Sequence, residues 1–211
     1  MKVTIFGATG ATGTSLTERA LEAGYEVTAV VRDPGRMRVP AHQRLHVVTA
    51  DVLDPAAISP AVADSGAVLT AIGPPGTGPS TLRQDSTRSI IAAMEKTGAR
   101  RLMVITGSIV NDDGESPYLR YLLKPVARRT FLRHVYADML AAEEEIHAST
   151  LEWKIFRPPS LNSKPAKGAY RIAIDRTLPH CFRITRDDLA TGMLGLLEDP
   201  VTDHRHICIA N

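Results

Sequence analysis

Short apolar runs alternate along the chain with longer stretches in which apolar residues recur at helical spacing. The runs predict strands at 3–6, 26–31, 46–49, 67–72, 102–105 and 153–156. The longer stretches predict helices at 12–23, 54–63, 81–97 and 131–148. Nearly uninterrupted apolar strands joined by helices are typical of a parallel sheet that is covered on both faces. We therefore expect an α/β fold built on a doubly wound parallel sheet.

The pattern changes after Phe156, where Arg157-Pro158-Pro159 ends the last long strand. Shorter elements follow: strands at 170–174 and 182–184 that we expect to form a small separate sheet, a helix at 189–197 and a last strand at 206–209. The interpretation is one domain over 1–211 with a small substrate-side lobe at 157–186. The longest irregular stretch, 107–130, is of a length that usually marks a functional or mobile loop.

Composition is that of an average globular protein, with 44% apolar and 23% charged residues. The formal net charge of +2 argues against a dedicated nucleic-acid binder. The two cysteines, Cys181 and Cys208, are far apart in the chain and favour a reducing compartment. No apolar run has the roughly 20 residues that span a bilayer. We therefore expect a soluble cytoplasmic protein with no nucleic-acid or membrane partner.

A glycine loop, Gly7-Ala8-Thr9-Gly10-Ala11-Thr12-Gly13, directly follows the first predicted strand and opens the first predicted helix. Gly7 permits a tight turn, Gly10 lets the backbone approach a pyrophosphate, and Gly13 lets helix and strand pack closely. The helix N-terminus then offers backbone N–H groups to the phosphates. The loop, including Thr9, Ala11 and Thr12, is predicted to bind a dinucleotide as in Rossmann folds.

The second predicted strand ends at Arg32, where an NAD site has a carboxylate for the ribose 2′-OH. Asp33 comes one residue later and is expected to point away. A guanidinium suits a 2′-phosphate, with Arg36 or Arg38 as a second cation, so the sequence favours NADP(H). The alternative for Arg36 and Arg38 is a solvated loop charge.

Further ligand contacts are expected where the other strands end, because ligands bind at the carboxyl edge of such sheets. Asp51 and Val52 are placed to line the adenine, and Gly73 follows the fourth strand. The candidates at the nicotinamide and acceptor end are the hydroxyls of Thr106, Ser108 and Ser160, as catalytic or orienting groups, and the backbone at Pro158. For each serine a turn-forming role is the alternative.

The catalytic pair of classical short-chain dehydrogenases, Tyr-x-x-x-Lys, is absent, since none of the five tyrosines has a lysine four residues on. No hydrolase signature is present either. His204 and His206 alternate on a predicted strand, but without a third ligand nearby we expect no metal site. The sequence thus favours an acceptor that needs no side-chain proton donor.

The chain resembles the atypical short-chain dehydrogenase/reductase proteins with an NAD(P)H-binding fold, most closely the flavin and biliverdin-IXβ reductases. The matching segments cover nearly the whole chain in order: 5–10, 23–28, 31–33, 51–53, 90–94, 158–159, 168–170 and 184–189. Two positions depart from that family. The hydroxyl of Ser108 is shifted by one residue, and Ser160 replaces a histidine. Both lie at the expected acceptor position, so the resemblance supports binding of the cofactor more strongly than it supports the identity of the substrate.

The resemblance implies NADPH-dependent hydride transfer to a flavin, a linear tetrapyrrole or a quinone, in a monomer or small homo-oligomer. An alternative of another class is a redox sensor of the NmrA-like kind, which binds NADP(H) without turnover. An epimerase or dehydratase of sugar nucleotides is a weaker alternative, because such enzymes usually need the tyrosine and a larger lobe.

Charged residues in the second half of the chain leave further alternatives. A basic stretch could receive a flavin phosphate or tetrapyrrole propionates, or could be a solvated surface: Arg120, Lys124, Arg128, Arg129 and Arg133. Asp138 is expected on a solvated helix face in preference to the pocket. The run Glu143-Glu144-Glu145 is expected on the solvent side of the same helix.

Overall fold

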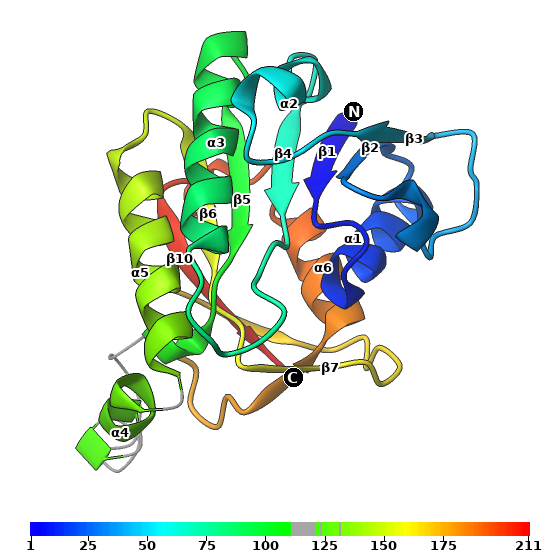
Figure 1. Ribbon diagram of the computed structural model, residues 1–211. Coiled ribbons are helices and arrows are strands. Elements are labelled where there is room, and N and C mark those ends of the chain that lie inside the picture. The colour runs from blue at the N-terminus through cyan, green and yellow to red at the C-terminus, as the bar shows by residue number, and fades with distance from the viewer. Residues whose placement is uncertain (111–120, 123, 131) are drawn as a thin grey trace.

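The computed structural model describes residues 1–110, 121–122, 124–130 and 132–211. At its centre is an eight-stranded sheet with the order β3-β2-β1-β4-β5-β6-β10-β8 (Figure 1). Its strands are β1 Lys2–Phe6, β2 Glu26–Val31, β3 Leu45–Thr49, β4 Ala67–Thr70, β5 Arg101–Ile105, β6 Glu152–Phe156, β8 Arg171–Ile174 and β10 Arg205–Ala210. All neighbours pair in parallel except β10 and β8. The expected doubly wound sheet is confirmed.

Helices cover both faces of this sheet. Their bounds are α1 Ala11–Glu22, α2 Pro55–Val62, α3 Leu82–Thr97, α4 Lys124–Arg129, α5 Arg133–Ala148 and α6 Arg186–Gly195. Successive strand side chains point to opposite faces, so Val3 and Ile5 of β1 pack with α1 and α6, whereas Phe6 packs with α2 and α3. Buried aliphatic residues on both faces of every central strand explain why the strands read as continuous apolar runs.

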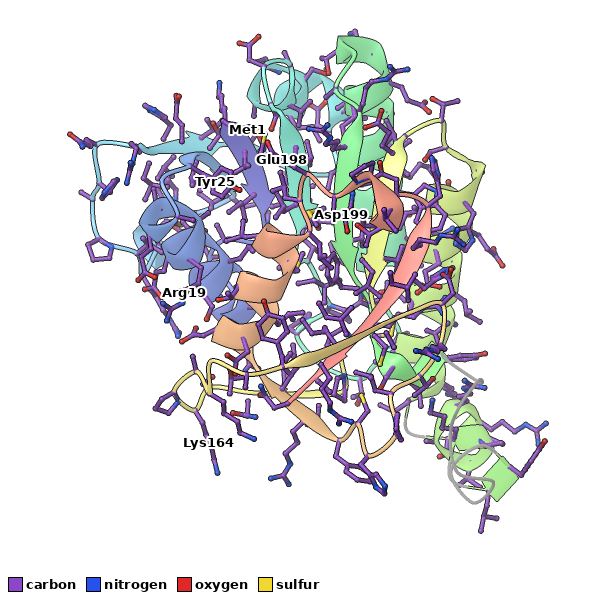
Figure 2. All side chains as sticks on the ribbon, turned by 180° about the vertical axis from the view of Figure 1, so that it is seen from behind. Met1, Arg19, Tyr25, Lys164, Glu198 and Asp199 are labelled. Carbon is purple, nitrogen blue, oxygen red and sulfur yellow. The ribbon has the colours of Figure 1, made fainter. Side chains whose placement is uncertain are left out.

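Helices α1 and α6 lie side by side on one face, although they are far apart in the chain (Figure 2). Arg19 of α1 binds Asp187 in the first turn of α6, with Nη2 3.1 Å from Oδ2. Arg19 also binds Glu22 of its own helix, with Nη1 2.6 Å from Oε2. These contacts lie at the rim of the apolar layer between the two helices.

The C-terminal part differs from the expected separate sheet in one respect. Strand β8 joins the main sheet as an antiparallel edge, with Ala173 opposite Cys208 of β10. Only β9 Arg183–Thr185 belongs to a second sheet, where it pairs with β7 Ser160–Asn162, a strand that the apolar pattern did not indicate. The expectation for 170–174 was wrong because β10 has backbone groups on its outer edge, and β8 satisfies them.

Asp188 in the first turn of α6 fastens the C-terminal segments together. Its carboxylate accepts hydrogen bonds from the backbone N–H of Lys167 (2.9 Å) and Gly168 (3.0 Å), from Thr185 Oγ1 (2.7 Å) and from Asn211 Nδ2 (2.9 Å). Burial alone would raise the pKa of Asp188, but these hydrogen bonds outweigh it and lower the pKa. The carboxylate therefore stays charged while it holds the 164–168 turn against α6.

None of the helices in the described part of the chain is long and apolar enough to cross a membrane.

Candidate cofactor and acceptor site

The glycine turn after β1 has a geometry that only glycine permits at two of its positions. Gly7 adopts φ +81°, and its carbonyl accepts a hydrogen bond from Gly10 N at 3.0 Å. A Cβ on Gly13 would lie 2.1 Å from the oxygen of Gly7. Helix α1 thus packs directly against the turn, as expected from the spacing.

Helix α1 begins after Gly10 with no side-chain cap and no acidic residue in its first turn. The first N–H groups of a helix have no partner inside the helix, and the helix dipole adds a partial positive charge there. Ala11, Thr12 and Gly13 form this first turn. The arrangement fits a pyrophosphate, which would accept hydrogen bonds from the turn and helix N–H groups.

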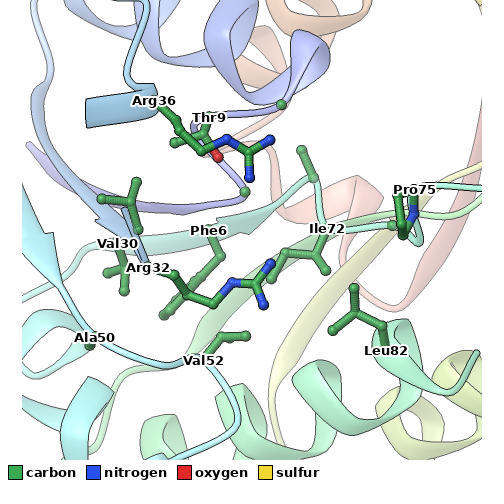
Figure 3. Close-up of a pocket in the computed structure, with 15 residues that line it drawn as sticks. Phe6, Thr9, Val30, Arg32, Arg36, Ala50, Val52, Ile72, Pro75 and Leu82 are labelled. Atoms are coloured by element: carbon green, nitrogen blue, oxygen red, sulfur yellow. The ribbon is translucent and has the colours of Figure 1, made fainter. Parts of the chain in front are cut away.

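A cavity of about 390 Å³ opens beside this turn at the carboxyl edge of the sheet (Figure 3). It is lined by Phe6, Gly7, Thr9, Gly10, Val30, Val31, Arg32, Arg36, Ala50, Val52, Ala71, Ile72, Gly73, Pro75 and Leu82. The structure therefore brings together many of the residues predicted to bind the cofactor: Gly7, Thr9, Gly10, Arg32, Arg36, Val52 and Gly73. Its apolar wall at Val30, Ala50 and Val52 suits an aromatic base.

Arg32 and Arg36 extend their guanidinium groups into this cavity (Figure 3). Arg32 follows β2, and Arg36 ends a short 3₁₀ turn, Pro34–Arg36. Asp33 caps that turn, with Oδ1 2.9 Å from Gly35 N, and is not among the lining residues. The cavity end beside β2 is thus bordered by two cations.

Asp51 lies outside the lining, unlike its neighbour Val52. Its Oδ1 accepts a hydrogen bond from Leu53 N at 3.0 Å, which closes a local turn.

The four candidates for the nicotinamide and acceptor end follow β5 and β6, beyond the lining of this cavity. Thr106 is buried, and its Oγ1 donates to Glu143 Oε1 at 2.7 Å. Ser108 N donates to the carbonyl of Pro158 at 2.9 Å, which ties the two strand ends together. Ser160 is exposed at the start of β7.

Glu143 is 2% exposed, so its predicted place on the solvent side of α5 was wrong. Its carboxylate faces Arg157 in a two-pronged contact: Nε donates to Oε1 at 3.1 Å and Nη2 donates to Oε2. Glu143 stands four residues after Met139 and three before Ile146, which are both buried. Helical spacing thus placed it on the inner face. The run of three glutamates hid this signal.

Asp138 is 4% exposed, and its predicted place on a solvated helix face was also wrong. Its carboxylate accepts hydrogen bonds from the backbone N–H of Arg83 (3.3 Å) and Gln84 (3.0 Å) in the first turn of α3. It also accepts one from Arg83 Nη1 at 3.3 Å. A residue of α5 therefore caps α3, a role that no local motif indicates.

Arg83 lies behind the wall of the cavity, and the sequence analysis did not single it out. Burial lowers the pKa of Arg83 from its ordinary value, and the attraction of Asp138 opposes this effect. Its Nε is buried without a hydrogen-bond partner among the described residues. A Cβ on Gly73, a lining residue of the cavity, would lie 2.8 Å from Arg83 Nη2. Arg83 thus backs the cavity wall at Gly73.

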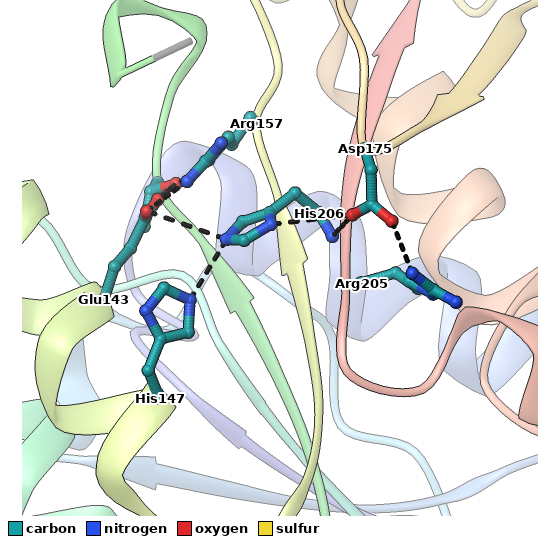
Figure 4. Close-up of polar contacts among 7 residues, drawn as sticks. Glu143, His147, Arg157, Asp175, Arg205 and His206 are labelled. Carbon is teal, nitrogen blue, oxygen red and sulfur yellow. Dashed lines mark hydrogen bonds and ion pairs between the residues drawn. The ribbon is translucent and has the colours of Figure 1, made fainter.

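His147 of α5 and His206 of β10 meet beside Glu143, with their Nε2 atoms 3.1 Å apart (Figure 4). Burial lowers the pKa of His206, and Arg157 adds to the effect while Glu143 opposes it. Burial also lowers the pKa of His147. Among the described residues, no group of three His, Cys, Asp or Glu side chains could hold a metal ion.

The basic stretch is partly internal. Lys124 Nζ donates to the carbonyl of Ser108 at 2.7 Å. Arg128 Nε donates to the carbonyl of Ile109 at 2.8 Å, and its guanidinium lies 4.7 Å from the ring centroid of Tyr136. Arg129 and Arg133 are exposed, and Arg120 lies outside the described residues. These contacts anchor the backbone after β5 to α4. The expectation that 107–130 is irregular was wrong at its C-terminal end, where Lys124–Arg129 form a helix.

The glycine turn, the uncapped helix and the cavity at the sheet edge define a nucleotide-binding Rossmann-like protein. The family model described as NAD(P)H-binding matches residues 7–200, and the chain belongs to this family. Its cofactor is therefore a nicotinamide dinucleotide.

One relative and two solved structures illustrate what the chain is similar to. A chloroplast protein of Arabidopsis thaliana is 29% identical over 177 residues, which cover 79% of this chain and 61% of that protein. The chain thus spans less than two thirds of that relative. The oxidoreductase YlbE of Lactococcus lactis superimposes with a TM-score of 0.81 at 19% identity, covering 100% of this chain and 91% of the other. ChuY, an anaerobilin reductase of Escherichia coli O157:H7, gives 0.79 at 22% identity, with 100% and 97% covered. At these identities the two structures show the common fold.

Proposed function

We propose that the protein is an NADPH-dependent reductase that transfers hydride to a flavin or a related conjugated acceptor, such as a linear tetrapyrrole or a quinone. The observation that carries the choice of NADPH is the pair Arg32 and Arg36 at the cavity end beside β2. A 2′-phosphate there would meet two guanidinium groups and no carboxylate from Asp33, which caps its own turn.

In this proposal the protein contributes mainly binding and orientation. The bound cofactor supplies the hydride, as nicotinamides do. The turn at Gly7 and Gly10 and the first turn of α1 hold the pyrophosphate, and the 2′-phosphate is held at Arg32. The backbone at Pro158 and the hydrogen bond between Ser108 and Pro158 shape the nicotinamide end.

Thr106 is less suited to proton transfer than its position after β5 indicated. Its hydroxyl is engaged as a donor to Glu143, whose carboxylate is also held by the two-pronged contact with Arg157. Ser108 and Ser160 remain the hydroxyls proposed to orient the nicotinamide amide or the acceptor. An acceptor whose second proton comes from water fits such a site better than a ketone or an aldehyde does, because reduction of a carbonyl group needs a proton donor for its oxygen.

The acceptor class is supported by the absence of Tyr-x-x-x-Lys from the sequence and by the likeness to a reductase that acts on anaerobilin. The alternative is an NADP(H)-binding sensor without turnover. Both would use the cavity in the same way.

The experiment that separates them is NADPH oxidation by the purified protein with FMN, FAD, riboflavin and a quinone, beside an NADH control. Turnover of a flavin with NADPH is the expected result. Tight NADPH binding with no turnover on any acceptor would overturn the reductase and support the sensor.

The cofactor choice is tested at Arg32. In Arg32→Ala we expect the KM for NADPH to rise by roughly 10- to 100-fold, because one charge-assisted contact to the 2′-phosphate is lost. The KM for NADH should change little. Arg38→Ala is the matched control, since Arg38 is exposed and does not line the cavity. Equal effects of Arg32→Ala on both cofactors would contradict the NADPH assignment.

A further inference from the structure

The two cysteines of the chain, 27 residues apart in sequence, meet in the fold. Their Sγ atoms lie 3.6 Å apart. Cys208 is 2% exposed within β10, whereas Cys181 is half-buried in the segment 175–182, which joins β8 to β9. The large separation in sequence, which favoured a reducing compartment, therefore says nothing about their distance in space.

Strand alternation shows on which face the pair lies. Ile207 and Ile209 belong to the apolar cluster under α1 and α6, so Cys208 points to the opposite face, together with His206. The segment 175–182 is attached to β10 at its other end as well. There Asp175 accepts hydrogen bonds from His206 N (3.0 Å) and Arg205 Nη1 (2.9 Å) (Figure 4).

We propose that Cys181 and Cys208 form a reversible disulfide that fastens the segment 175–182 to β10 when the protein meets a small-molecule disulfide such as oxidised glutathione. The sulfur atoms need to approach by only about 1.5 Å to reach the bond length of about 2.05 Å. In this proposal a side-chain rotation of the half-buried Cys181 closes the gap.

The reaction proceeds by thiol–disulfide exchange. The thiolate of Cys181, the more accessible of the two, attacks one sulfur of oxidised glutathione, and one glutathione thiolate leaves. The thiolate of Cys208 then attacks the Cys181 sulfur of this mixed disulfide and expels the second glutathione. The two protein thiols are oxidised by two electrons, and one molecule of oxidised glutathione is reduced to two molecules of glutathione, which take up the two released protons.

The cross-link connects β10 of the main sheet to the segment that leads into the small sheet of β7 and β9. Strand β9, which follows Cys181, pairs with β7, and β7 follows Pro158 and Pro159 at the carboxyl edge of the sheet. A bond from Cys181 to Cys208 therefore restrains the segment that connects the edge strand β8 with the small sheet. Its formation does not depend on the proposed reductase activity.

The test is oxidation of the full-length protein with oxidised glutathione, followed by thiol alkylation, intact mass and peptide mapping. We expect a loss of two hydrogens from the mass, no alkylation of either cysteine, and a cross-linked peptide that dithiothreitol releases. Thermal denaturation should occur about 5 °C or more higher in the oxidised form, because the cross-link restricts the unfolded chain. A stable glutathione adduct on Cys181 with Cys208 still open to alkylation would overturn the proposal.

Two variants keep the test decisive. Cys181→Ser should show neither the cross-link nor the thermal shift, and an equal shift in this variant would refute the assignment. Cys208→Ser should instead accumulate the mixed disulfide on Cys181, because the resolving thiol is absent. Since Cys181 is only half-buried, its replacement by serine should leave the reduced fold intact.

Discussion

At the scale of single residues, two features stand out in the candidate cofactor site: the absence of a side chain on the glycines of the turn, and the positive charge of two arginines. The carbonyl of Gly7 occupies the space where a side chain of residue 13 would begin. Arg32 and Arg36 are exposed and border the same cavity beside β2 with positive charge. The shape of the site is therefore most sensitive to substitution at the glycine turn, and in the proposed function the selectivity for NADPH depends on the arginines that follow β2.

Gly13→Ala is expected to destabilise the protein by about 3 kcal/mol and to abolish cofactor binding, because its Cβ would lie 2.1 Å from a backbone oxygen. Urea denaturation and NADPH binding by fluorescence measure the two effects. Gly195→Ala at the end of α6 is the matched control, since a Cβ there meets no atom within 4 Å. If both variants had the same stability as the parent, the close packing of α1 on the turn would be disproved.

At the scale of elements, α5 is more than a cover for the sheet. Through Asp138 it caps α3, and through Glu143 it holds Arg157 and Thr106 at the ends of β6 and β5. Glu145 of the same helix also binds Arg88 of α3, with its Oε1 2.6 Å from Arg88 Nη2. One helix thus fixes the positions of three elements that border the site.

Asp138→Ala should lower the free energy of unfolding by about 3 kcal/mol, because it leaves the buried Arg83 without its carboxylate partner and the first turn of α3 without its cap. Chemical denaturation measures this loss. Glu144→Ala, on the exposed face of the same helix, should change the stability by less than about 0.5 kcal/mol. A loss in Asp138→Ala no larger than that in Glu144→Ala would argue against the capping role.

At the scale of the whole molecule, charges join α5, β6 and β10 on one side of the sheet. His147 and His206 lie between Glu143, Glu144, Arg157 and Asp175, and burial lowers the pKa of both imidazoles. The folded state thus favours the neutral rings. Two protonated imidazoles 3.1 Å apart would repel each other beside Arg157.

The stability of the protein should therefore fall as the pH drops below the ordinary histidine pKa of about 6.5. Below that value the unfolded chain binds more protons than the folded chain, so the free energy of unfolding decreases down to the lowered folded pKa values. Urea midpoints between neutral and mildly acidic pH measure the slope. His147→Gln should reduce it, whereas His42→Gln, on an exposed loop, should not. A slope unaffected by His147→Gln would show that this pair does not titrate as inferred.

The main strands, the helices and the glycine turn could be predicted because each depends on residues that are close in sequence. Apolar runs marked β1 to β6, and the spacing of Gly7, Gly10 and Gly13 marked the turn. The predictions for Asp138, Glu143 and 170–174 were wrong for one common reason. Their partners lie in other elements: Arg83 in α3, Arg157 after β6, and β10 for 170–174. Neither the burial of a charge nor the pairing of a strand can be predicted until the partner element is known.

The sequence by itself determined the class of fold and the nicotinamide cofactor, since periodicity and backbone freedom are local properties of the chain. The tertiary structure decided which charges are buried and which residues meet. It set Asp138 on the end of α3, turned Thr106 towards Glu143 and brought Cys181 to Cys208. These contacts arise from packing helices on a sheet, which places side chains together without regard to their separation in sequence.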